Sequence, residues 1–298
     1  MDFFALLVVN GLLVGTLYSL IALGFVLIYK ATDAINFAQG ELVMIAGFFV
    51  AALIQLYRVP LAATVAIAVL AMMLLGFGIE RVMLRPLIGR PVIAVIMATI
   101  GLAAILKGTG PLVWGAETKN LPLPIPEAPF LVNVLDVVVL VSPIQLVAAG
   151  VSLAFLAVFG YIFLRSRMGI AMRAVADSQQ VAMAMGINVE RYFALAWAMA
   201  GIVSALGGII WGNLLGVDVH LALVGLKVFP VVILGGLDSI PGAVVGGLIV
   251  GVVEGVAAGY IDPYVGGGTK DFVPYLLMIL ALMVRPYGIF GKEIIERV

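Results

Sequence analysis

Residues 3–29 read FFALLVVNGLLVGTLYSLIALGFVLIY, and this stretch decides the fold class. It contains no Asp, Glu, Lys or Arg, and it is longer than the roughly 20 apolar residues that cross a bilayer as a helix. The apolar core of a removable signal is shorter and follows basic residues, whereas only Met1-Asp2 precedes this run. We therefore expect residues 3–29 to form a first membrane-spanning helix.

The remaining sequence repeats this pattern. Of the 298 residues 64% are hydrophobic and only 11% are charged, against about a quarter charged in soluble domains. Apolar runs fall at 3–29, 36–57, 61–83, 91–110, 142–164, 192–212, 224–236, 242–258 and 271–285. Prolines mark the long connection at 111–141 as irregular or extended. We predict an all-α, polytopic transmembrane helix bundle of about eight to nine spans, forming one domain over residues 1–298.

Composition also excludes several functions. The chain has no cysteine and a single histidine, His220, so thiol catalysis and Cys- or His-clustered metal sites are ruled out. A net charge of zero argues against a nucleic-acid partner. No phosphate-binding loop of the Gly-x-x-x-x-Gly-Lys-Ser/Thr type is present. We expect no cofactor, no metal and no catalytic residues, and hence no enzyme.

Basic residues predict the orientation. With nine crossings, the connections near 81–90 and 165–191, Lys30 and the carboxyl-terminal tail lie on the same side and hold most of the sixteen basic residues. Basic connections remain cytoplasmic. The amino terminus is therefore predicted outside and the carboxyl terminus in the cytoplasm.

Two apolar segments around 235–242 are shorter than the others. The run 224–236 is too short to cross about 30 Å of hydrocarbon, and the turn that follows, Gly235 to Gly242, is rich in Gly and Pro. This pattern indicates a broken or re-entrant helix pair, which is tolerated where protein or a water-filled cavity surrounds it. A plain cytoplasmic turn between two short, tilted helices is the alternative.

Small residues at helical spacing predict close helix packing. The sixth run carries one stripe of them: Ala194, Ala198, Gly201, Ala205, Gly208 and Gly212. Further stripes are Gly11, Gly15 and Ser19 in the first run, and Gly247, Gly251 and Gly255 in the eighth. Helices in lipid associate through such close backbone contacts.

Residues 165–191 are too polar to span a membrane, yet they have helical character. Asp177 and Gln180 fit a capping box that opens a short helix ending at Gly186. Small and apolar residues recur at helical spacing from Ala171 to Met185. Such a face docks into a groove of a partner, or it rests on its own bundle or on the bilayer surface.

Three ordered segments of the chain resemble one known family. The pattern Gly169, Arg173-Ala174, Ala182 and Gly186-Ile-Asn-Val189 is similar to the cytoplasmic coupling loop of permease subunits in branched-chain amino acid ABC importers. Residues 18–29 with 35–42, and residues 232–243, look like that family's amino- and carboxyl-terminal signatures. The length is similar to the H-type (LivH-like) permease subunit. Gln39 and Asp238 depart from the family pattern, which often has His and Gly there.

The resemblance implies a bacterial inner-membrane pump assembled from separate chains. This subunit would pair with a second permease subunit, with two cytoplasmic ATPase subunits and with a periplasmic substrate-binding protein. It would act as the substrate-translocating subunit for branched-chain or related amino acids. The residues implied in ATPase coupling are Gly169, Arg173, Ala174, Asp177, Ala182 and Gly186.

Polar residues beside the helix breaks are candidates for the substrate pathway, because polar groups inside spans are costly and often functional. These are Asn36, Gln39, Glu41, Asp238 and Ser239. The alternative role is helix capping, which suits Asn36 and Asp238. Rival functions also stay open: the same architecture carrying urea or short amides, or a stand-alone channel or secondary transporter without an ATPase.

Overall fold

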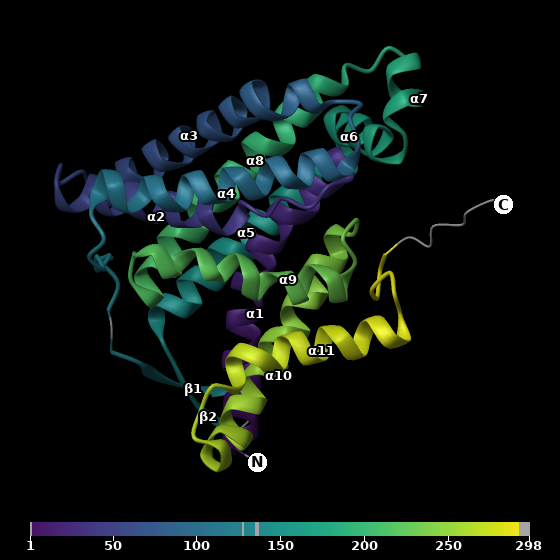
Figure 1. The fold of residues 1–298 in the computed structure, drawn as a ribbon. Helices are drawn as coiled ribbons and strands as arrows, with labels where there is room; N and C mark the ends of the chain where they lie inside the picture. Colours follow the sequence, from purple (N-terminus) through teal and green to yellow (C-terminus); the bar gives the residue numbers. More distant parts are fainter. Residues whose placement is uncertain (1, 127, 135–136, 292–298) are drawn as a thin grey trace. The chain divides into compact units, whose positions relative to one another are not determined.

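The computed structural model describes residues 2–126, 128–134 and 137–291, which are mostly helical (Figure 1). Each of the nine predicted apolar runs corresponds to one helix of the described chain. These helices are α1 Asp2–Thr32, α2 Gln39–Gln55, α3 Leu61–Ile79, α4 Val92–Trp114, α5 Pro143–Arg165, α8 Val189–Leu215, α9 Leu223–Gly235, α10 Ile240–Val265 and α11 Thr269–Val284. Two shorter helices, α6 Arg167–Asp177 and α7 Gln179–Ala184, connect α5 to α8. The prediction of a polytopic helical bundle is confirmed.

Six helical segments of the described chain are long and apolar enough to cross a membrane by themselves. They are Phe3–Thr32, Leu61–Leu87, Val92–Trp114, Pro143–Arg165, Val189–Leu215 and Ile240–Val265. The segments Gln39–Gln55 and Val219–Gly235 are apolar but shorter. The second of these includes the 3-10 turn η3, Val219–Ala222, before α9. The number of spans therefore stays a prediction.

The long connection contains structure that the prolines did not predict. Helix α4 continues through Pro111 to Trp114, where Gly115 at φ +90° ends it. The strands β1 Phe130–Val134 and β2 Val137–Val141 then pair antiparallel, with Phe130 opposite Val141. Pairing satisfies backbone groups that an irregular segment would leave to solvent.

The chain divides into two compact units. One contains Leu23–Leu123 and Val158–Leu226, and in it α8 packs on α2 and α3. The predicted stripe of small residues explains this packing. A Cβ atom built on Gly201 would meet the backbone carbonyl of Met72, and one on Gly76 would meet that of Trp197. The α3 and α8 backbones therefore touch directly, as expected where small residues replace hydrophobic side chains at an interface in lipid.

Gly76→Ala is expected to destabilise the α3–α8 contact because the added methyl group overlaps the Trp197 carbonyl. Overpacking of this kind costs about 1–3 kcal/mol. The measurement is the unfolding midpoint of the detergent-purified protein. Gly78→Ala on the same helix is the matched control, since a Cβ there meets nothing within 4 Å. Equal midpoints for the two variants would contradict this packing.

The other unit contains Met1–Ala22, Pro124–Ala157 and Lys227–Val298. Its α1 and α10 meet along the two predicted stripes: a Cβ on Gly11 would lie 2.7 Å from the Gly251 carbonyl oxygen, and one on Gly15 would lie 2.7 Å from that of Gly247. Ser19 Oγ adds a hydrogen bond to the Val244 carbonyl at 3.1 Å. The predicted small-residue faces therefore pack against each other.

Only one helix of the pair around 235–242 is short. Helix α9 has 13 residues and α10 has 26, so the expectation of two short segments was wrong for the second. Gly235 and Gly242 lie backbone to backbone at the turn. The segment after α11 satisfies the end of α9, since Ile289 N donates to Leu234 O at 2.8 Å and Phe290 N to Gly235 O at 3.0 Å. Re-entry of this pair into the membrane stays a prediction.

Candidate functional site

The segment from Arg165 to Arg191 folds as two short helices, each opened by a serine. Ser166 Oγ accepts a hydrogen bond from Gly169 N at 3.0 Å and caps α6, and Ser178 Oγ accepts one from Val181 N at 3.3 Å and caps α7. Asn188 caps the start of α8 in the same way. These caps fix where each helix begins, because they satisfy amide groups that have no partner inside the helix.

The predicted capping box was placed one residue too early. Asp177 is the last residue of α6, and Ser178 supplies the cap of α7. The extended backbone of Ser178, with φ −160°, separates the two helices, so the small-residue pattern from Ala171 to Met185 does not form one continuous face. The predicted end near Gly186 is right, since α7 stops at Ala184 and Gly186 has φ +80°.

Two of the predicted coupling residues hold α6 against the end of α5. A Cβ on Gly169 would overlap the Phe163 carbonyl, so only glycine permits this approach. Arg173 Nη1 donates to the Phe163 carbonyl at 2.9 Å, and its guanidinium lies 5.6 Å from the centroid of the Phe163 ring. A cation at the last carbonyls of a helix is favourable. Gly169 and Arg173 therefore position the segment.

The other four predicted coupling residues differ in exposure. Ala182 is buried and Ala174 is half-buried, whereas Asp177 and Gly186 are exposed. Ala182 thus contacts the protein itself.

Four large apolar side chains of the segment are exposed, of which the predicted stripe included Met185 and missed the other three. Their exposed fractions are 56% for Ile170, 61% for Val181, 50% for Met183 and 78% for Met185. We call these four residues the outer apolar surface. The apolar residue types could be read from the sequence, whereas their exposure depends on how α6 and α7 pack.

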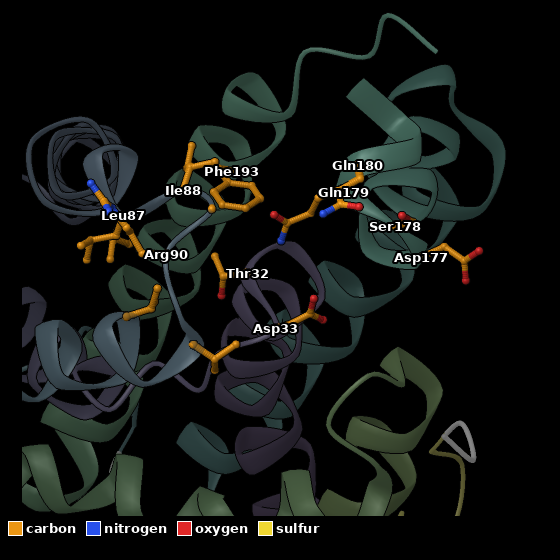
Figure 2. Close-up of a pocket in the computed structure, with 14 residues that line it drawn as sticks. Thr32, Asp33, Leu87, Ile88, Arg90, Asp177, Ser178, Gln179, Gln180 and Phe193 are labelled. Atoms are coloured by element: carbon orange, nitrogen blue, oxygen red, sulfur yellow. The ribbon is translucent and has the colours of Figure 1, made fainter. Parts of the chain in front are cut away.

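A cavity of about 400 Å³ lies where the α6–α7 turn meets the end of α1 and the α3–α4 connection. Figure 2 shows Gln179 and Gln180 on one side, Thr32 and Asp33 below, and Phe193 with Ile88 above. Gln179 Nε2 donates to the Ala31 carbonyl at 3.2 Å, which fastens α7 to the last turn of α1. Partial desolvation raises the pKa of the Asp33 carboxyl above its ordinary value. The hydrogen bond from Gln179 links the α6–α7 turn to the last turn of α1.

An ion-pair network joins the end of α3 to the start of α8. The π-helical turn η1, Glu80–Leu84, follows α3. Arg85 Nη2 lies 3.3 Å from Glu80 Oε2, and Arg85 Nη1 lies 3.0 Å from Glu190 Oε2. The Glu80 side chain is fully buried, and Arg85 supplies its counter-charge. Turns of π-helix are frequent at functional sites.

Two of the predicted pathway candidates, Asn36 and Gln39, form a buried cluster with Ser204 where the chain breaks between α1 and α2. Asn36 Oδ1 accepts a hydrogen bond from Ala38 N at 3.0 Å, and Asn36 Nδ2 donates to Gln39 Oε1 at 3.2 Å. Gln39 Nε2 donates to Ser204 Oγ of α8 at 3.0 Å. All three side chains are 0% exposed. Asn36 thus forms a turn before α2, and the missed member Ser204 links that turn to α8.

The remaining pathway candidates lie at the starts of two helices, α2 and α10. Glu41 is half-buried in the first turn of α2. Ser239 is the cap of α10, because its Oγ accepts from Gly242 N at 3.0 Å. Asp238, which the sequence favoured for capping, directly precedes it.

Ser239→Ala is expected to lower the free energy of unfolding by about 1 kcal/mol, the usual cost of losing a helix cap. The expected readout is a lower unfolding midpoint in detergent with unchanged uptake kinetics. Ser239→Thr keeps the hydroxyl and serves as the control. Changed kinetics in Ser239→Ala without a shift in midpoint would instead favour a pathway role.

The fold and these sites define a class: a multi-pass helical membrane protein in which two short helices, α6 and α7, contact the ends of two longer ones. Among the described residues, no group of three or more His, Asp or Glu side chains is placed to hold a metal ion.

Residues 7–282 match the family model described as "Branched-chain amino acid transport system / permease component", and the chain belongs to this family. One relative, "High-affinity branched-chain amino acid transport system permease protein BraD" of Pseudomonas aeruginosa, is 36% identical, with 97% of this chain and 96% of the relative covered. The LivH permease protein of Salmonella typhimurium is 33% identical with the same coverage. A "probable" LivH permease of Methanocaldococcus jannaschii is 28% identical over 95% of this chain and 91% of its own. The predicted family, and with it a transport subunit, is confirmed.

Proposed function

We propose that this chain is the substrate-translocating permease subunit of an ATP-driven importer for branched-chain amino acids. The outer apolar surface on α6 and α7 carries the proposal. A helix with exposed apolar side chains outside the membrane fits a groove of a partner protein. The names of the relatives support the cargo class.

The arrangement around the segment supports a coupling mechanism. A partner ATPase that binds Ile170, Val181, Met183 and Met185 would push on a rigid element, because Gly169 and Arg173 hold α6 to the end of α5. Gln179 would carry displacement to α1, and Asn188 begins α8 directly after the segment. Rigid elements that move as bodies are one established means of switching between states.

The partners and the orientation follow from this assignment. We propose a second permease subunit, two cytoplasmic ATPase subunits and a periplasmic substrate-binding protein. The basic connections then lie in the cytoplasm of a bacterium, with the chain in the inner membrane, the amino terminus outside and the carboxyl terminus inside. ATP hydrolysis belongs to the ATPase subunits.

Asn36 and Gln39 keep a proposed role beside the pathway, with Glu41 and Asp238, whereas Ser239 is assigned to capping α10. The break between α1 and α2 places the cluster on the continuation of the helix that Gln179 contacts. Movement of α1 that is passed on to α2 would strain the Gln39–Ser204 hydrogen bond, which joins α2 to α8. A displacement of α6 and α7 would therefore change the hydrogen bonds of this cluster even if the cargo does not contact the cluster.

The test is ATPase activity of the importer purified through a tag on this chain. We expect stimulation by a binding protein loaded with leucine, isoleucine or valine, and none by the unloaded protein. Stimulation only with urea or a short amide would keep the mechanism and overturn the cargo. Failure of any ATPase subunit to co-purify would favour the channel or secondary-transporter alternative.

A further inference from the structure

A second cavity of about 400 Å³ lies in the unit that contains the first turns of α1. Its walls are formed by α1, the start of α5, α10 and Lys270 at the start of α11. The lining residues of α10 recur at helical spacing from Gly251 to Asp262, and most of them are Gly or Ala. Small residues on this face leave room for a ligand between helices that elsewhere touch backbone to backbone.

The wall contains a buried carboxylate, that of Glu254, which is 6% exposed in the middle of a helix long enough to span the membrane. Tyr18 Oη donates to Glu254 Oε2 at 2.8 Å. No described residue donates a hydrogen bond to Oε1. Burying a carboxylate is costly unless charge and hydrogen bonds compensate. One phenol hydroxyl compensates only part of this cost, so the site is suited to a further donor that carries positive charge.

Other polar groups of the cavity wall already form hydrogen bonds within the protein. Asn10 Nδ2 donates to the Leu6 carbonyl at 3.1 Å and to the Leu140 carbonyl at 3.4 Å, which leaves its Oδ1 as an acceptor. Asp262 accepts hydrogen bonds from the backbone and the hydroxyl of Thr269, so it holds the α10–α11 turn. The available acceptors are thus Glu254 Oε1 and Asn10 Oδ1.

A cation and an apolar surface complete the cavity. Lys270 is exposed and forms none of the described ion pairs, whereas the neighbouring Asp271 pairs with Lys227 at 2.8 Å. Leu7 and Val14 supply apolar wall on the side of α1. Acceptors for an ammonium group, a cation for a carboxylate and an aliphatic wall match the parts of an apolar α-amino acid.

We propose that this cavity is a binding site for the cargo amino acid during transport, with Glu254 and Asn10 accepting hydrogen bonds from its ammonium group and Lys270 attracting its carboxylate. The inference rests on the proposed function. A purely structural role for Glu254 is less suited to the geometry, because Gly11, Gly15 and Ser19 already join α1 to α10 without the carboxylate.

The absence of cysteine from the sequence permits a direct test. Ala258→Cys places one thiol in the cavity wall, and Val256→Cys places one on the same helix outside the lining. Both positions are half-buried, so they form a matched pair. The assembled importer in proteoliposomes is treated with cationic aminoethyl or anionic sulfonatoethyl methanethiosulfonate, with and without leucine and its binding protein. ATP-dependent leucine uptake is measured in the same vesicles.

We expect the thiol at position 258 to react faster with the cationic reagent, and Glu254→Gln to lower the cationic-to-anionic rate ratio about tenfold. Leucine should slow labelling at 258 and leave 256 unchanged, and Glu254→Gln should remove this protection. Tyr18→Phe keeps the Glu254 carboxylate, so leucine should still protect the thiol at position 258 in this variant. If Glu254→Gln does not fold, the inference is tested by the two cysteine variants alone. Leucine should then slow labelling of the thiol at position 258 and not of the thiol at position 256.

Two results would overturn the inference while the importer still transports leucine: equal labelling of both thiols with and without leucine, or an unchanged rate ratio in Glu254→Gln. Loss of leucine uptake by the unsubstituted importer would instead contradict the proposed function. The two failures are therefore distinguishable in one preparation.

Discussion

Replacing Val181 and Met185 together by glutamate is expected to abolish ATP-driven uptake while the chain still folds and inserts. Both side chains are mostly exposed, at 61% and 78%, so the change removes no packing inside the protein. Placing charge in an apolar docking surface weakens binding because the carboxylates lose water without gaining a partner. Loss of two anchor residues should weaken ATPase binding by at least about tenfold.

The measurement is the amount of ATPase subunit that co-purifies with a tagged chain, alongside the amount of the chain in the membrane. Gln180→Glu is the control, since Gln180 is exposed on the same short helix as Val181 and gains one carboxylate without losing an apolar contact. Unchanged co-purification of the double variant would contradict docking through the outer apolar surface. Equal loss in Gln180→Glu would show that charge, not apolar contact, matters.

Arg85→Ala is expected to cause the largest loss of stability among the single substitutions considered. Glu80 is fully buried and depends on Arg85 for its counter-charge. A buried carboxylate left without its partner is strongly destabilising, because it has lost water and gained no counter-charge. The structure also predicts an asymmetry: Glu80→Gln should be milder, because the partly exposed Arg85 keeps its contact with Glu190 at 3.0 Å.

The readout is the unfolding midpoint in detergent together with the yield from membranes. Arg81→Ala is the control, since Arg81 lies in the same π-helical turn and is exposed. If Arg81→Ala and Arg85→Ala lower the midpoint equally, the Glu80 network does not hold α3 to α8. A greater loss in Glu80→Gln than in Arg85→Ala would also contradict the account.

The helices were predictable because the membrane imposes a simple rule: apolar runs of sufficient length become helices. The stripes of small residues were equally informative, since Gly11 and Gly251 could be recognised as contact positions from spacing alone. The single-domain organisation of residues 1–298 stays a prediction, as do the number of spans and the orientation. The pairing of β1 with β2 was not predicted, because strand pairing depends on register as well as on composition.

The sites were harder to predict because they depend on contacts between distant residues. Tyr18 and Glu254 are far apart in the sequence, yet they share a hydrogen bond. The partner of Gln39, Ser204, lies on another helix and has no distinctive sequence signal. Ser178 caps α7, although Asp177 could have capped it equally well by residue type.

The central claim is that ATP drives cargo through this chain. The most direct measurement is uptake of radiolabelled leucine into proteoliposomes containing the chain, its co-purified partners and binding protein, with and without ATP on the ATPase side. The account predicts uptake that requires ATP, is competed by isoleucine and valine, and is lost in the Val181→Glu, Met185→Glu double variant. Uptake by the chain alone, indifferent to ATP, would contradict it.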